Sequence, residues 1–234
     1  MVGVDQSKVG EYFSVKWFSD WEGYGCVALR DVDEHTLIHT EEPFLRGPQL
    51  NQALDNHMNG IHESELDDKG YLKNECHKSD DEIDHLWQLH DQYTHRYSDK
   101  SKKRLWGIIS SNIFSNHEKD YQKRLYLATS RFNHSCSPNL GYDFDDWRIR
   151  IYSLRNIKAG EVLCISYSDV IYFFPREKRR NYLLGALGFK CACSRCSDDY
   201  DSTVSDESRR RLKRIAMDLK HRCGSTLYSS GMQL

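Results

Sequence analysis

The stretch that decides the fold is RFNHSCSPN, residues 131–139, which places two amides, an imidazole, a thiol and a proline within nine positions. Pro138 has no backbone N–H, and it biases Ser137 toward an extended conformation. We therefore predict that Asn133 to Cys136 form a tight, irregular turn after a helix. Polar side chains held in such a turn are aimed at a common point and do not form ordinary core.

A second dense element is CACSRC, residues 191–196, which carries three thiols. Structural zinc sites are tetrahedral, so three thiols leave one position open, and unligated they would expose reactive groups. Cys136 is the predicted fourth ligand. The expected zinc site thus consists of Cys136, Cys191, Cys193 and Cys196, with unligated thiols as the alternative.

Length and composition set the broad class. The chain has 234 residues, 38% of them hydrophobic, with a formal net charge of −2, which fits one core-bearing domain plus a small appendage. No general basic field points to nucleic acid. Residues 1–10 have no apolar core and no small-residue cleavage site, and no run of about 18 apolar residues occurs, so we expect a non-membrane protein of the nucleus or cytoplasm. In such a compartment the eight cysteines are thiols or metal ligands.

Three motifs together resemble one family. The Asn-His-Ser-Cys-x-Pro-Asn run, the later Ile165-Ser166-Tyr167 and the closing C-x-C-x-x-C resemble SET-domain lysine methyltransferases with a post-SET zinc motif, closest to the SMYD-like and fungal branch. The resemblance runs in order from about Gly23 to Cys196. The cysteine-rich MYND finger of the SMYD proteins is missing, so its partner-binding role is not carried over.

The resemblance implies a fold class and its subdivision. The class is mixed α+β, mainly β: small twisted sheets with inserted helices, a pseudoknot-like threaded segment at Asn133 and a zinc-bound tail. Such threading breaks the usual rule for connections. The expected parts are an N-terminal SET part (1–48), a polar and helical insertion (49–132), a C-terminal SET part (133–190), the post-SET motif (191–196), and an acidic linker with a final helix (197–234).

Cofactor contacts also follow from the resemblance. It implies that S-adenosylmethionine is held by the residues at these positions: Glu22, Gly23, Tyr24, Asn112, Asn133, His134, Tyr167 and Phe189. Phe189 would pack against the adenine. From the residues alone, the glycine-flanked stretch at Gly23 is typical of a hairpin turn, and an Asn-His pair is typical of a helix C-cap.

Methyl transfer to an amine first needs a neutral amine. A lysine side chain has a pKa of about 10.4, so at pH 7 the neutral form costs about 4.6 kcal/mol. A narrow apolar channel beside a cationic sulfonium lowers that pKa. The resemblance makes Tyr167 the catalytic hydroxyl, although a tyrosine ending a strand is usually a core aromatic. Tyr172, Phe173 and Phe174 are candidate channel walls or ordinary core.

Local patterns predict the secondary structure. Strands are expected over residues 12–18, 26–32, 36–42, 147–154 and 162–167, with a glycine turn at 22–25. Helices are expected over 81–97 and 118–132, from Pro175 to Leu187 with Gly188 as the stop, and around 212–219 after an acidic linker at 198–206.

Two further clusters have plain interpretations. His57, His62, Cys76 and His77 match no standard zinc spacing and are expected to be idle surface groups. The basic run at 100–104 is expected to be a solvated helix end, with a nuclear address or a substrate-facing patch as alternatives.

The leading hypothesis is a protein-lysine methyltransferase that uses S-adenosylmethionine and zinc and acts on a protein or histone-tail substrate. We expect a monomer without a direct nucleic-acid or membrane partner. The alternatives are a catalytically inactive SET-like module that binds a peptide or partner, and a zinc-stabilised nucleic-acid adaptor, which the neutral charge balance disfavours.

Overall fold

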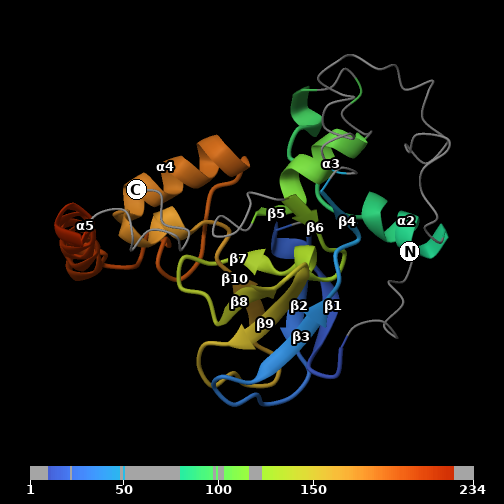
Figure 1. Cartoon of the computed structure of the whole chain (residues 1–234), viewed down its shortest axis with the longest axis horizontal. Helices are drawn as coiled ribbons and strands as arrows, with labels where there is room; N and C mark the ends of the chain where they lie inside the picture. Colours follow the sequence, from blue (N-terminus) through green and yellow to red (C-terminus); the bar gives the residue numbers. More distant parts are fainter. Residues whose placement is uncertain are drawn as a thin grey trace. The chain divides into compact units, whose positions relative to one another are not determined.

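The computed structural model describes residues 10–21, 23–47, 50, 80–96, 99, 103–115 and 123–223 (Figure 1). Two compact units emerge. The first contains the described residues of 10–40 and 131–223, and the second those of 41–115 and 123–130. The metal, cofactor and channel residues predicted above belong to the first unit, except Asn112, which is in the second, and Glu22, which lies outside the described residues.

The central sheet of the first unit joins segments that are far apart in the chain. Its order is β1 (Phe13–Phe18), β2 (Gly23–Ala28), β10 (Val162–Ile165) and β7 (Asn133–His134). Strand β2 runs antiparallel to both of its neighbours, while β10 runs parallel to β7, with Cys164 opposite Asn133 and Ile165 opposite His134. Strand β10 therefore fixes the motif of residues 131–139 against the N-terminal hairpin.

A second sheet has the order β3 (Leu37–Glu41), β9 (Arg148–Ser153) and β8 (Leu140–Asp145). Along β9 the buried positions alternate, with Ile149 and Ile151 fully enclosed, which confirms the predicted period of two. The turn from β8 to β9 places Asp146 at φ 54°. Aspartate is one of the few non-glycine residues that tolerate this region.

The described residues of the second unit include a small sheet and the helices α2 and α3. The sheet has the order β4 (Leu45–Arg46), β6 (Lys123–Leu125) and β5 (Ile113–Ser115), and the helices are α2 (Asp80–Trp87) and α3 (Leu105–Asn112). Their shared core contains these buried residues: Phe44, Leu45, Leu50, Ile83, Leu86, Leu89, Ile108, Ile109 and Leu125.

The C-terminal part of the first unit is helical. Helix α4 (Arg176–Leu187) begins after Pro175 and ends at Gly188, whose φ of 76° is left-handed and whose N–H bonds the Leu184 carbonyl at 3.2 Å. Both ends were predicted, since proline suits a helix start and glycine a left-handed stop. Together with the small sheets and inserted helices, this confirms the mixed α and β class.

Helix α5 (Thr203–Cys223) starts earlier than the predicted acidic linker allows. The reason is Asp206, whose carboxylate accepts hydrogen bonds from the Arg176 N–H at 2.8 Å and the Ser202 hydroxyl at 3.0 Å. Asp206, which the sequence analysis assigned to a linker, thus joins the first turn of α5 to the start of α4.

Two predicted helices are wrong in whole or in part. Within 118–132, the described residues form β6 and a 3-10 turn, Thr129–Arg131, because β6 pairs on both edges and the Glu41 carboxylate accepts the Ala128 and Thr129 N–H groups. The helix predicted over 81–97 stops at Trp87. Beyond it the buried Asp91 carboxylate accepts the N–H groups of Tyr93 and Arg104, which favours a turn over helix.

The predicted glycine turn is also displaced. Gly23 to Gly25 lie inside β2, and the reversal occurs in a 3-10 turn at Ser19–Trp21. Register explains the shift, because Phe18 pairs with Gly23 and the chain must therefore reverse between these two residues.

No helix in the described ranges is long and apolar enough to cross a bilayer.

Asn139 extends the parallel pairing beyond the two residues of β7. Its side-chain N–H₂ donates to the Val162 carbonyl at 2.9 Å, and its side-chain oxygen accepts the Cys164 N–H at 2.8 Å. The Ser135 N–H adds a bond to the Ile165 carbonyl at 3.0 Å. The side chain of Asn139, the second amide of the motif, therefore bonds to the backbone of β10 as a paired strand would.

We predict that Asn139→Ala lowers the free energy of unfolding by about 2 to 4 kcal/mol, because it leaves the part-buried Cys164 N–H and Val162 carbonyl without these partners. Asn156→Ala is the matched control, since Asn156 is exposed and accepts a single bond from the Glu34 N–H. Urea denaturation of both variants measures the difference. Equal losses would contradict a strand-like role for Asn139.

Candidate functional site

Four cysteine sulfurs converge in the first unit. The Sγ atoms of Cys136, Cys191, Cys193 and Cys196 all lie within 4.8 Å of one another. Cys136 Sγ is 3.9 Å from Cys191 Sγ and 3.6 Å from Cys196 Sγ. Zinc–sulfur bonds of about 2.3 Å give a tetrahedron with an edge of roughly 3.8 Å. The spacing therefore suits a tetrahedral zinc ion, and the structure brings together the same four cysteines that the sequence analysis grouped.

The thiol chemistry points the same way. Four thiolates whose sulfurs all lie within 4.8 Å of one another would repel each other strongly. Ionising all four sulfurs together therefore requires a strong cation among them. A set of four soft thiolates selects zinc over the harder magnesium or calcium ions. The cluster could hold zinc.

Two arginines that the sequence analysis missed line this cluster. Arg179 is fully buried, donates to the carbonyls of Phe174 at 2.7 Å and Arg195 at 3.0 Å, and approaches Cys196 Sγ at 3.9 Å. Arg209 donates to the carbonyls of Tyr172 at 2.6 Å and Cys136 at 3.4 Å. Zinc with four thiolates carries two negative charges, which these two guanidinium groups would offset in a site where uncompensated charge is costly.

Sequence alone hides both residues among other arginines. Arg179 belongs to the run REKRR at 176–180, and Arg209 opens the run RRR at 209–211. One available signal was helical spacing, because Arg179 and Leu183 are the two buried residues of α4. Arg209 offered no comparable signal.

His134 connects the cysteine cluster to the central sheet. Its Nδ1 accepts the Tyr167 N–H at 3.1 Å, and its Nε2 lies 3.3 Å from Cys136 Sγ. Burial lowers the pKa of His134 to about 4, which Arg179 reinforces and Cys193 opposes. The ring is therefore neutral at pH 7. Since Nδ1 accepts, the proton sits on Nε2 and is donated to the sulfur.

Three aromatic rings from separate segments meet beside this contact. Ring centroids of His134 and Tyr167 are 5.3 Å apart, those of His134 and Phe189 5.8 Å, and those of Tyr167 and Phe189 6.1 Å. The three rings thus lie close together although His134 and Phe189 are more than fifty residues apart in the chain. Such a group of rings suits a flat, partly aromatic ligand.

Tyr167 presents a fixed hydroxyl. Although 39% of the residue is exposed, its hydroxyl donates to the Phe132 carbonyl at 2.9 Å. This enclosure raises the pKa of Tyr167. The phenol therefore stays protonated across the neutral range, where it can position a ligand but cannot serve as a base.

Asn133 on β7 and Tyr24 on β2 lie on the two strands that flank β10. The Asn133 side chain donates to the Tyr24 carbonyl at 2.9 Å, and the Arg131 guanidinium lies 5.5 Å from the centroid of the Tyr24 ring. Gly23 begins the same strand. The structure thus brings together Gly23, Tyr24, Asn133, His134, Tyr167 and Phe189 around one sheet and the segment that follows α4.

Other predicted residues are placed differently. Asn112, in the second unit, donates its amide hydrogens to the His90 and Ile108 carbonyls, each at 2.7 Å, so its contact with the cofactor stays a prediction. Tyr172 and Phe173 lie in the 3-10 helix Asp169–Phe173. Phe174 follows and packs against the cysteine cluster, with the Lys178 ammonium 4.4 Å from its ring centroid.

The two lesser clusters are only partly described. His57, His62, Cys76 and His77 lie outside the described residues, as do residues 100–102 of the basic run. Lys103 of that run donates to the Trp87 and Leu89 carbonyls at 3.1 and 2.7 Å. A cation bound to carbonyls at the end of α2 supports the helix-end interpretation for this residue.

Comparison with known proteins identifies the class. A family model described as the SET domain matches residues 23–168, which is more than half of the chain. The chain therefore belongs to the SET-domain family.

Named relatives refine this membership. A SET domain-containing protein of Acanthamoeba polyphaga mimivirus is 26% identical over 206 residues, covering 81% of this chain and 78% of its own length. Mouse histone-lysine N-methyltransferase SMYD3 is 34% identical over 97 residues, covering 41% of this chain and 22% of its own length. Protein-lysine N-trimethyltransferase SMYD5 of Gallus gallus is 38% identical over 89 residues, covering 36% and 21%. This chain thus matches about a fifth of each of these two methyltransferases.

We predict that the purified protein binds one zinc ion and that Cys193→Ser weakens zinc binding by more than about a hundredfold, beyond the range typical of changes outside the ligand shell. Cys164→Ser is the control, because Cys164 lies outside the cluster. Elemental analysis and chelator competition measure both variants. Equal zinc retention in the two would exclude the four-cysteine site.

Proposed function

We propose that this chain transfers the methyl group of S-adenosylmethionine to the ε-amine of a lysine in a protein substrate, with histones as candidates. The observation that carries the proposal is the convergence of Asn133-His134, Tyr167 and Phe189 beside the cysteine cluster. Membership of the SET family and relatives named lysine methyltransferases support it. Such a protein would work in the nucleus or cytoplasm.

The methyl donor would be held on one side of the central sheet. The Asn133 amide, already oriented by the Tyr24 carbonyl, the imidazole of His134 and the ring of Phe189 offer polar and aromatic contacts for a nucleoside and an amino acid. The main chain of Glu22, Gly23 and Tyr24 and the side chain of Asn112 complete the proposed set. When bound, the donor supplies an electrophilic methyl group on a cationic sulfur.

Tyr167 would orient the incoming amine. Because its hydroxyl proton is donated to the Phe132 carbonyl, the lone pairs of the phenolic oxygen can accept an N–H from the substrate. The nitrogen lone pair then points at the methyl carbon. Held in this way by Tyr167, the neutral amine would form its new N–C bond as the C–S bond of the donor breaks, and the positive charge would pass from sulfur to the methylated nitrogen.

Water takes the proton that the lysine must lose before transfer. The raised pKa of Tyr167 keeps its hydroxyl protonated near pH 7, so this group cannot accept the proton. The lowered pKa of His134 means that its ring does not hold an added proton near pH 7. The chain's contribution is desolvation and alignment, which disfavour the charged amine and hold the reacting atoms in line. Tyr172, Phe173 and Phe174 are the proposed walls of the substrate channel, where aromatic faces attract an amine.

We predict that Tyr167→Phe lowers kcat at least a hundredfold while the affinity for S-adenosylmethionine changes less than about threefold, because loss of alignment costs several kcal/mol only in the transition state. Labelled methyl transfer onto histones and cell extract, followed by mass spectrometry, gives kcat. Tyr152→Phe on β9 is the matched control. A protein that binds cofactor and peptide but transfers no methyl would be the inactive binding module.

Zinc removal tests the link between the cluster and the cofactor contacts. Because His134 donates to Cys136 and Phe189 lies two residues before Cys191, we expect a chelator to abolish binding of S-adenosylmethionine, measured by calorimetry, and added zinc to restore it. A zinc-free preparation with full cofactor affinity would refute this link.

A further inference from the structure

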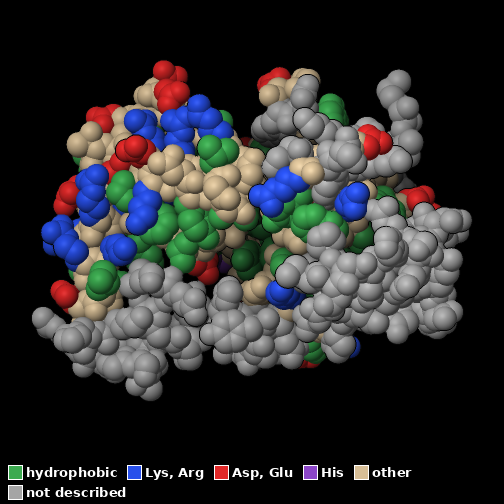
Figure 2. Space-filling model, turned by 90° about the horizontal axis from the view of Figure 1, so that it is seen from above, with side chains coloured by type: hydrophobic (Ala, Val, Ile, Leu, Met, Phe, Trp, Pro, Cys, Tyr) green, Lys and Arg blue, Asp and Glu red, His purple; other side chains and the backbone are tan. Residues whose placement is uncertain are grey.

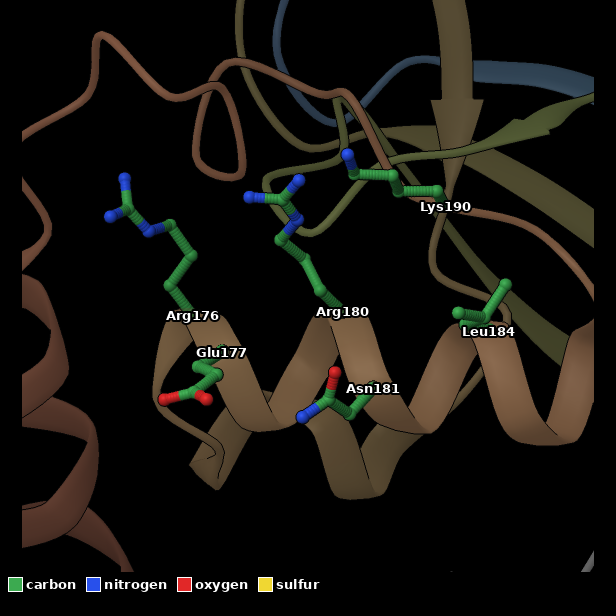
Figure 3. A pocket seen from close by; sticks show the side chains of 6 residues that line it. All are labelled: Arg176, Glu177, Arg180, Asn181, Leu184 and Lys190. Carbon is green, nitrogen blue, oxygen red and sulfur yellow. The ribbon is translucent and has the colours of Figure 1, made fainter.

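A cavity beside α4 is lined by none of the residues proposed to hold the methyl donor or the target lysine. It measures about 350 Å³ and is lined by Arg176, Glu177, Arg180, Asn181, Leu184 and Lys190. Figure 3 shows the Arg176 and Arg180 side chains extending from the same side of the helix, with the Lys190 side chain reaching toward Arg180. Three cations and one carboxylate therefore share one concave site.

The three cations differ in their hydrogen-bond and ion-pair partners. Arg176 donates to the Ser197 and Tyr200 carbonyls at 3.1 and 2.7 Å. Arg180 pairs with the Asp198 carboxylate at 2.7 Å. Lys190 is exposed and makes no hydrogen bond or ion pair with another described residue. An anion that enters the cavity would thus meet the ammonium of Lys190 and the guanidinium of Arg180, where it could replace Asp198.

The Arg180–Asp198 pair indicates the chemistry of that anion. The Asp198 side chain is 82% exposed whereas that of Arg180 is 21% exposed, so a carboxylate reaches this guanidinium from the solvent side. Ion pairs with so exposed a partner contribute little to stability. A carboxylate from another molecule could replace Asp198 at small cost, and the planar guanidinium suits it.

The surrounding surface favours an acidic partner. Residues 176–223 contain 13 Lys and Arg against 7 Asp and Glu, a net charge of +6 in a chain whose total is −2. Figure 2 shows Lys and Arg side chains gathered over the side of the molecule that carries α4 and α5. Such a field attracts acidic segments and speeds their encounter.

The cavity is also tied to the proposed reaction site. Lys190 directly follows Phe189, whose ring centroid is 6.1 Å from that of Tyr167. We propose that the cavity receives an acidic side chain of the protein substrate, from the polypeptide that carries the target lysine. This inference rests on the proposed function, and it makes the substrate class a lysine-bearing segment with Asp or Glu nearby.

A polypeptide fits the cavity better than nucleic acid does. Glu177 lines it and Asp198 sits beside Arg180, so carboxylates interrupt the cationic track that a row of phosphates requires. Leu184 adds an exposed apolar side chain to the lining. Carboxylate recognition next to an apolar contact is typical of peptide binding.

Fluorescence anisotropy of two labelled peptides tests the inference. Each has one central lysine, flanked on both sides by glutamates in one peptide and by glutamines in the other. We expect the glutamate peptide to bind at least about tenfold more tightly, as charge-assisted hydrogen bonds to two cations imply. The double variant Arg180→Gln, Lys190→Gln should remove that preference. Lys190→Gln alone, at an exposed position, should reduce it by a smaller factor.

The matched control is Arg210→Gln with Arg211→Gln, which removes the same charge from exposed positions of α5 outside the cavity. This control should retain most of the preference for the glutamate peptide. An equal loss in both double variants would mean that the preference comes from general electrostatic attraction, and it would overturn the proposed site. Tighter binding of a labelled 15-base-pair duplex through Arg180 and Lys190 would overturn it in favour of nucleic acid.

Methyl transfer onto the same peptides separates the two proposals. Cavity-dependent binding without any transfer would refute the proposed function and leave the acidic-peptide site standing. Transfer to both peptides with equal kcat/KM, unaffected by the cavity variants, would refute the site and leave the proposed function standing.

Discussion

The convergence of four sulfur atoms is the constraint on which the rest of the structure depends. Cys136 and Cys191 are 55 residues apart in the chain, yet their sulfurs lie 3.9 Å from each other. Thiols this crowded are stable as ligands of one cation, and the buried Arg179 and the Arg209 contact to the Cys136 carbonyl suit the charge that four thiolates would bring. Closing such a long loop with a metal would stabilise the fold and fix the positions of the residues on either side of Cys136.

Strand β10 carries that constraint to the candidate site. It pairs with β2 on one edge and with β7 on the other, so Tyr24 lies on one flanking strand and Asn133 and His134 on the other. Tyr167 follows two residues after the end of β10. His134 then contacts both Tyr167 and Cys136. A neutral imidazole and a protonated phenol suit a reaction that depends on alignment more than on proton transfer, as methyl transfer does. The cation-lined cavity beside α4 would add substrate choice to that chemistry.

Sequence patterns predicted correctly the features that depend on residues close together in the chain. Pro175 and Gly188 mark the ends of α4, the alternation of β9 follows its buried face, and the cysteine spacing suggested the four-sulfur group. The failures have nonlocal causes. The Glu41 and Asp91 carboxylates capture distant N–H groups and replace predicted helix with turns. Asn139, Arg179 and Arg209 gain their roles from partners that no nearby residue indicates. The roles of Asn112 and of the aromatic residues 172–174 remain predictions.

X-ray absorption at the zinc edge tests the central claim most directly, because it reports the atoms bound to the metal in the intact protein. The account predicts one zinc ion per chain with four sulfur neighbours at about 2.3 Å and no nitrogen or oxygen in the first shell. A spectrum with two or more nitrogen or oxygen ligands, or a folded protein that binds no zinc, would contradict it.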